Sequence, residues 1–60
     1  MWKMDFSSAR EYMRQGIGSE HAASNAVEMA FATGLPQTLA GRTVQYVPDQ
    51  GFRVWKPAAR

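Results

Sequence analysis

Several residue types are absent or scarce in this 60-residue sequence, which has no cysteine and one histidine. The absence of cysteine excludes disulfides, and a lone histidine offers no recognisable metal-ligand spacing. No run approaches the ~18 consecutive apolar residues of a membrane span, and the N-terminus lacks the apolar core of a signal peptide. We therefore expect a soluble protein without a membrane partner, with the cytoplasm as the default localisation.

The length indicates one small domain over residues 1–60. A chain of this size buries only about 60% of the surface that its unfolded form exposes, so its stability is marginal. A hydrophobic content of 45% nevertheless argues against disorder. Without a disulfide or a metal, we expect stability to come from good packing, self-association or partner binding.

Charge is unevenly divided between the two halves of the chain. Residues 1–30 carry three basic and four acidic groups, a net of −1, whereas residues 31–60 carry four basic groups and one acidic group, a net of +3. These sum to the overall +2. The basic end is therefore the C-terminal half.

The clearest pattern is a helix over residues 20–33, around which the other elements are expected to pack. Ser19 suits the N-cap and Gly34 suits the left-handed residue that closes a helix. Its apolar residues follow the helical spacing of one face: Ala23, Ala26, Val27, Ala30 and Phe31.

Two elements are expected before this helix. Residues 1–6 alternate apolar and polar, which is the period of a half-buried strand. Ser8 and Glu11 form a capping-box pattern that predicts a first helix over residues 9–15. Pro36 and Gly41 then suggest one further helical turn after the second helix.

A β-hairpin is predicted from strands at 42–47 and 52–56, joined by the Pro-Asp-Gln-Gly sequence of residues 48–51. We expect Val47 opposite Phe52, which places Tyr46 and Trp55 on the same face. The fold class is then α+β, in which a short N-terminal strand and the hairpin form a small antiparallel sheet against two helices.

Both faces of this hairpin are substantially apolar, although the helices can cover only one. Two interpretations of Tyr46 and Trp55 remain open. Either they complete a small core under the N-terminal strand or the tail, or they form an exposed aromatic patch beside Arg53, of the composition found at binding hot spots.

No catalytic, metal or cofactor signature stands out. His21 lies one turn inside a helix beside Glu20, which is typical of a solvated surface residue. The segment Gly16-Ile17-Gly18 precedes a helix but lacks the lysine and third glycine of a phosphate loop. We therefore expect a non-enzymatic protein with no catalytic residue, no metal and no cofactor.

Nucleic-acid binding is one alternative. The four-residue spacing of Ala26, Ala30 and Gly34 resembles the first helix and turn of a helix-turn-helix, and the order of elements resembles the small phage repressors of the Cro type. That resemblance implies a recognition helix in residues 36–40 and a wing formed by the hairpin. The basic residues available to the wing are Arg42, Arg53, Lys56 and Arg60.

A second resemblance involves the hairpin alone. The run Gln45-Tyr46-Val47-Pro48, followed by Gly51-Phe52-x-Val54, is similar to a short stretch in the small RNA-polymerase inhibitor of T7-like phages. The resemblance implies a protein that acts by binding another protein.

The leading hypothesis is a protein-interaction module, an accessory or inhibitor protein of the phage or mobile-element type. Met, Trp, Tyr and Arg, which are enriched in interfaces, number four, two, two and five, against two lysines. A structural subunit of a homo-oligomer is the third possibility. The predicted partner-binding residues are Tyr46, Arg53, Trp55, Lys56, Arg42 and Trp2.

Overall fold

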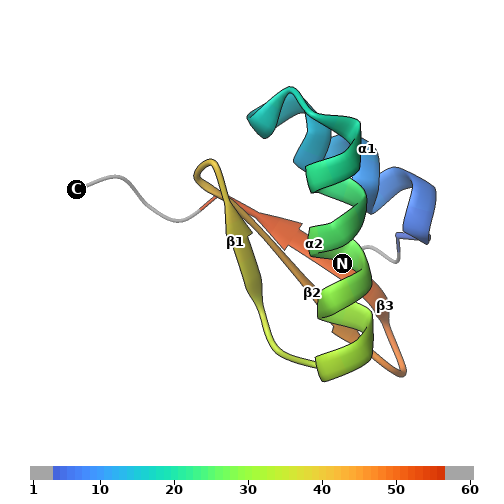
Figure 1. Cartoon of the computed structure of the whole chain (residues 1–60). Coiled ribbons are helices and arrows are strands. Elements are labelled where there is room, and N and C mark those ends of the chain that lie inside the picture. Colours follow the sequence, from blue (N-terminus) through green and yellow to red (C-terminus); the bar gives the residue numbers. More distant parts are fainter. Residues whose placement is uncertain (1–3, 57–60) are drawn as a thin grey trace.

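The computed structural model describes residues 4–56 of the chain. Two helices, α1 and α2, are followed by a three-stranded antiparallel sheet with the strand order β1-β2-β3 (Figure 1). The predicted α+β class with a C-terminal hairpin is therefore confirmed.

Helix α1 spans Phe6–Ile17 and begins three residues earlier than the predicted start at residue 9. Its N-cap is Asp5, whose carboxylate accepts a hydrogen bond from the Ser8 N–H at 2.8 Å. The prediction that Ser8 caps this helix is wrong, because Asp5 is the N-cap and Ser8 lies in the first helical turn, where its own N–H is satisfied by the Asp5 carboxylate. The helix ends at Gly18, which has φ 78 and donates its N–H to the Arg14 carbonyl.

Helix α2 spans Glu20–Thr33 and confirms the sequence prediction at both ends. The Ser19 hydroxyl accepts from the Ala22 N–H at 3.3 Å, and Gly34 closes the helix at φ 73. Ala23, Val27 and Ala30 are buried, as expected. Phe31 is not, because it lies on the flank of the helix and remains 58% exposed.

Strand β1 spans Gln37–Leu39, in the segment for which a helical turn was predicted. Its register with β2, Leu39 opposite Arg42, leaves a two-residue turn in which Ala40 and Gly41 have φ 52 and φ 79. Positive φ at both central residues gives a hairpin turn whose twist matches its strands. The prediction failed because alanine seldom adopts this conformation.

Strands β2, Arg42–Val47, and β3, Gly51–Trp55, form the predicted hairpin, but their register differs from the prediction by one residue. Val47 pairs with Gly51 rather than with Phe52, because the turn is closed by a bond from the Gln50 N–H to the Val47 carbonyl. A one-residue slip transfers every side chain of one strand to the opposite face. Tyr46 therefore pairs with Phe52, and Tyr46 and Trp55 lie on opposite faces of the sheet.

The N-terminal strand predicted over residues 1–6 is reduced, within the described residues, to one bridge between Met4 and Phe52. Phe6 already belongs to α1. Residues 1–3, including Trp2, lie outside the described part of the chain. The third strand of the sheet is β1 instead.

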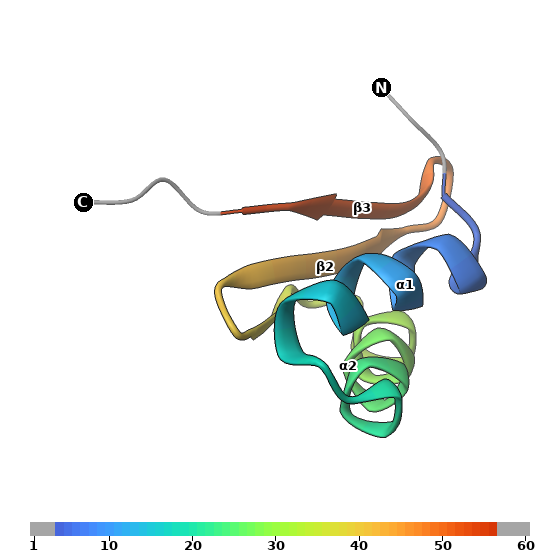
Figure 2. The same cartoon turned by 90° about the horizontal axis from the view of Figure 1, so that it is seen from above.

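The core lies between the helices and one face of the sheet. Figure 2 shows α1 and α2 on the same side of β2 and β3. Alanines at the helix contact allow the two helices to approach closely. The buried hydrophobic residues are Ala9, Met13, Ala23, Val27, Ala30, Val44, Phe52 and Val54. We call the sheet face that carries Val44, Phe52 and Val54 the inner face.

Candidate functional site

The opposite face of the sheet, which we call the outer sheet face, carries Thr38, Thr43, Gln45, Arg53 and Trp55. Pairing defines it, because directly paired residues share a face: Thr38 with Thr43, Thr43 with Trp55, and Gln45 with Arg53. No helix of the described region packs on this face, since both helices contribute to the core on the inner face. The outer sheet face is thus the face of the sheet that no helix in residues 4–56 covers.

Trp55 and Arg53 are the exposed side chains of this face on β3. Trp55 is 38% exposed, although tryptophan is large and apolar, and Arg53 is exposed two residues before it. Trp55 lies opposite Thr43, whose hydroxyl is 2.9 Å from that of Thr38. Because these hydroxyls bond to each other, the surface beside the indole has its polar groups satisfied.

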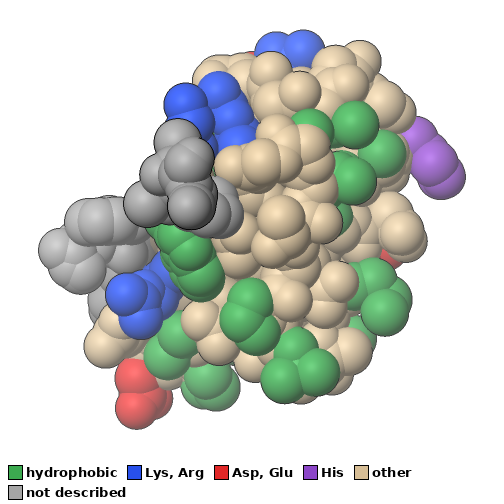
Figure 3. Space-filling model, turned by 90° about the vertical axis from the view of Figure 1, so that its left-hand side faces the viewer, with side chains coloured by type: hydrophobic (Ala, Val, Ile, Leu, Met, Phe, Trp, Pro, Cys, Tyr) green, Lys and Arg blue, Asp and Glu red, His purple; other side chains and the backbone are tan. Residues whose placement is uncertain are grey.

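Figure 3 views the molecule from the side that lies on the left in Figure 1. Hydrophobic side chains form several patches on this side, and basic side chains border them at the left of the view. The patches are separated by other side chains and backbone, and an acidic side chain lies at the lower left of the same view.

The structure brings together only part of the predicted partner-binding set. Arg53 and Trp55 share the outer sheet face, and Lys56 follows them as an exposed residue. Tyr46 is half-buried on the inner face, where its ring lies 4.9 Å from that of Phe52. Trp2 falls outside the described residues.

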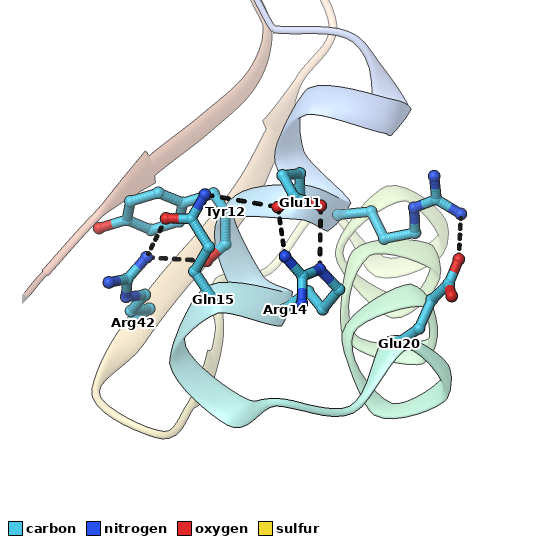
Figure 4. Close-up of polar contacts among 7 residues, drawn as sticks. Glu11, Tyr12, Arg14, Gln15, Glu20 and Arg42 are labelled. Atoms are coloured by element: carbon cyan, nitrogen blue, oxygen red, sulfur yellow. Dashed lines mark hydrogen bonds and ion pairs between the residues drawn. The ribbon is translucent and has the colours of Figure 1, made fainter.

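Arg42, also predicted to bind a partner, is engaged in internal contacts (Figure 4). Its guanidinium donates to the Tyr12 carbonyl at 2.9 Å and to the Gln15 side chain at 3.4 Å. The same guanidinium lies 4.5 Å from the centroid of the Tyr12 ring. Arg42 therefore ties β2 to the C-terminal half of α1, the end of a helix at which a cation is favourable.

Two further arginines pair with carboxylates of the helices (Figure 4). Arg14 bonds Glu11 at 2.6 Å, and Arg10 bonds Glu20 at 3.1 Å. Hydrogen bonds from Arg14 and then Gln15 lower the pKa of Glu11 from 4.5 to about 2. The pKa of Asp5 is also lowered, chiefly by the hydrogen bond from the Ser8 backbone. These groups stabilise helix α1 and its contact with α2 rather than forming a reactive site.

An aromatic cluster at the other end of the molecule was missed by the sequence analysis. Phe31 packs on Tyr46 with ring centroids 4.8 Å apart, Tyr46 contacts Phe52, and Phe52 meets Phe6 at 6.0 Å. Phe6 and Phe31 remain 36% and 58% exposed. No local spacing links these rings, because they come from both helices and two strands. We call these four residues the aromatic cluster.

The described region holds one histidine and no cysteine. It contains no group of three or more His, Cys, Asp or Glu residues that could hold a metal ion. His21 is exposed on α2. A shallow groove of about 410 Å³ runs along α1 and is lined by Met4, Ser7, Ser8, Glu11, Tyr12 and Gln15.

The helix-turn-helix interpretation does not fit the observed fold. Residues 37–39, which that interpretation assigns to a recognition helix, form strand β1. An α-helix is what enters the major groove in that motif. The described residues therefore contain no helix after α2 that could serve as the predicted recognition helix.

Comparisons with protein-family models, with curated proteins and with solved structures find no match to this chain. None of the helices in residues 4–56 is long and apolar enough to cross a membrane. The functional interpretation therefore rests on the chain's own surfaces.

Proposed function

We propose that this protein is a small, non-enzymatic protein-interaction module that acts by occupying a partner's surface, as an accessory or inhibitor protein does. One observation carries the proposal: the sheet is covered by helices on its inner face only, and Trp55 and Arg53 are exposed on the outer sheet face. Tryptophan and arginine are the residue types most enriched among binding hot spots.

Burial of this face would contribute useful binding free energy. A tryptophan buries up to about 250 Å² when fully enclosed, so burying the exposed 38% of Trp55 removes roughly 100 Å² from water. At about 25 cal/mol per Å² the gross transfer free energy is roughly 2.5 kcal/mol before the costs of association are subtracted, and a hot spot contributes about 2 kcal/mol or more. A marginally stable small domain also gains stability from its partner by linkage.

The test is affinity capture from cell lysate with the full chain, treated with and without nuclease at two salt concentrations. We compare the wild type with Trp55→Ala and with Phe31→Ala, a matched control that removes an exposed aromatic residue from the aromatic cluster. Circular dichroism verifies that both variants are folded.

We expect the wild type to capture a discrete protein that is still recovered after nuclease treatment. Trp55→Ala should fail to capture this protein, whereas Phe31→Ala should still capture it. Loss with Phe31→Ala alone would assign binding to the aromatic cluster and refute the outer sheet face. Recovery of nucleic acid that disappears at higher salt would replace the proposal with phosphate binding. A multimeric mass with no added partner, measured by light scattering, would instead favour a homo-oligomer.

A further inference from the structure

We infer that the outer sheet face binds an acidic segment of a partner protein, with an apolar residue of that segment against Trp55 and a carboxylate against Arg53. The inference rests on the proposed function and specifies the chemistry of the partner. Its basis is the distribution of charge between the two layers of the molecule.

The helical layer contains nearly all the described acidic residues. Asp5 caps α1, and Glu11, Glu20 and Glu28 lie on α1 and α2. Glu11 and Glu20 pair with Arg14 and Arg10. The helical layer thus carries four carboxylates and two guanidinium groups, and an acidic partner segment gains nothing by approaching it.

The sheet layer has the opposite sign. Of its basic residues in the described region, Arg42 is committed to the end of α1. Arg53 and Lys56 are exposed and make no hydrogen bond or ion pair with another described residue. The described acidic residue of this layer is Asp49, at the tip of the β2–β3 turn. The surface around Trp55 is therefore positive.

Spacing along β3 suggests the pattern that such a segment would have. Arg53 and Trp55 are two residues apart on one strand, so their side chains project from points about 7 Å apart. An extended segment lying along β3 has the same repeat on its facing side. An acidic residue two positions from an apolar residue would then meet Arg53 and Trp55 together, and arginine binds carboxylates through two parallel hydrogen bonds.

A protein segment fits this surface better than a nucleic acid does. Affinity for a nucleic acid grows with the number of phosphates that basic residues neutralise. Of the basic residues in the described region, Arg10, Arg14 and Arg42 are engaged within the fold, which leaves Arg53 on the outer sheet face and Lys56 directly after the end of β3. One aromatic anchor beside two cations matches a short peptide.

The experiment is selection of a random peptide library displayed on phage against the immobilised full chain. Parallel selections use Trp55→Ala, the double variant Arg53→Glu/Lys56→Glu, and Arg10→Glu/Arg14→Glu. The last variant is the matched control, because it makes the same change in net charge on the helical layer. A short fluorescein-labelled DNA duplex serves as a second probe, and circular dichroism verifies the fold of each variant.

We expect the wild type and the matched control to enrich peptides with Asp or Glu two positions from an apolar residue. The Arg53→Glu/Lys56→Glu variant should bind a recovered peptide at least about tenfold more weakly and should itself enrich basic peptides. Trp55→Ala should enrich nothing above the bare support.

Neutral or basic peptides on the wild type, or no enrichment, would overturn the inference while leaving protein capture through Trp55 intact. If Trp55→Ala recovered acidic peptides as well as the wild type does, these peptides would bind elsewhere on the protein, and the inference would also be overturned. DNA binding tighter than peptide binding, with a steep loss of affinity as salt rises, would overturn the assignment to a protein segment.

Discussion

Gly16 and Arg42 provide the sharpest test of the internal role assigned to Arg42. Gly16 lies in the last turn of α1, where alanine normally stabilises a helix by about 0.5–1 kcal/mol relative to glycine. Here a Cβ atom would lie 2.9 Å from Arg42 Cδ and 3.2 Å from its Cγ and Nε. The arginine side chain must therefore move in Gly16→Ala.

The movement costs the contacts that the guanidinium makes. The hydrogen bond to the Tyr12 carbonyl is worth about 1 kcal/mol, and the contact with the Tyr12 ring is worth about 0.5–1 kcal/mol. Together they exceed the helix gain, so Gly16→Ala should destabilise the wild type by about 1 kcal/mol, which lowers Tm by about 4–8 °C in a domain of this size.

The effect of Gly16→Ala on stability should change sign when Arg42 is absent. In an Arg42→Ala background the Cβ meets no guanidinium, so Gly16→Ala should stabilise the protein by about 0.5–1 kcal/mol. The measurement is a double-mutant cycle from urea unfolding followed by circular dichroism. Equal stabilisation by Gly16→Ala in both backgrounds would refute the internal role of Arg42.

Three further predictions concern local features of the fold. Ser19→Ala should lower the free energy of unfolding by about 1 kcal/mol by removing the cap of α2. Ser8→Ala should change it by less than about 0.5 kcal/mol, because Asp5 is the cap of α1. The urea midpoints of both variants measure the contrast, and an equal cost would contradict it. Ala40→Gly should raise stability by about 0.5–1 kcal/mol by relieving the positive φ of the β1–β2 turn, which thermal unfolding measures, and a lower Tm would refute it. The lowered pKa of Glu11 means that its stabilising contribution is complete above pH 4.5 and is lost as the pH falls to about 2. Glu11→Gln should therefore flatten the pH dependence of the urea midpoint across that window. An unchanged slope would rule this out.

Local signals in the sequence predicted α2 well because both of its ends are defined within a few residues. Ser19 and Gly34 satisfy the free amides and carbonyls of their own helix, so no distant contact is needed to define its limits. The start of α1 was harder to predict, since Asp5 and Ser8 are both good caps and the alternation before Phe6 favoured a strand.

The faces of the hairpin depend on its register, which was predicted wrongly from the turn residues. The observed register gathers four apolar residues on the inner face, so the alternation along the two strands favours it over the predicted register: Val44, Tyr46, Phe52 and Val54. The prediction assigned residues 48–51 to the turn, whereas Gly51 pairs with Val47 and belongs to β3. The observed register separates Tyr46 from Trp55 and places Tyr46 on the inner face.

The residues of the candidate site show the same division between local and distant information. Arg53 and Trp55 alternate with buried residues on one strand, so their shared face follows from the period of a strand. Arg42 and Tyr12 are 30 residues apart in the chain. Their contact, and the aromatic cluster, depend on how the helices pack on the sheet, which short-range patterns do not specify.

Site-specific photocrosslinking tests the central claim most directly. A photoreactive amino acid is placed at Gln45, a half-buried position of the outer sheet face opposite Arg53, and in a second protein at Glu28, an exposed position on α2. After irradiation in lysate treated with nuclease, we predict a discrete protein adduct from position 45 and none from position 28. An adduct from position 28 alone would contradict the claim that the outer sheet face is the surface that binds a partner.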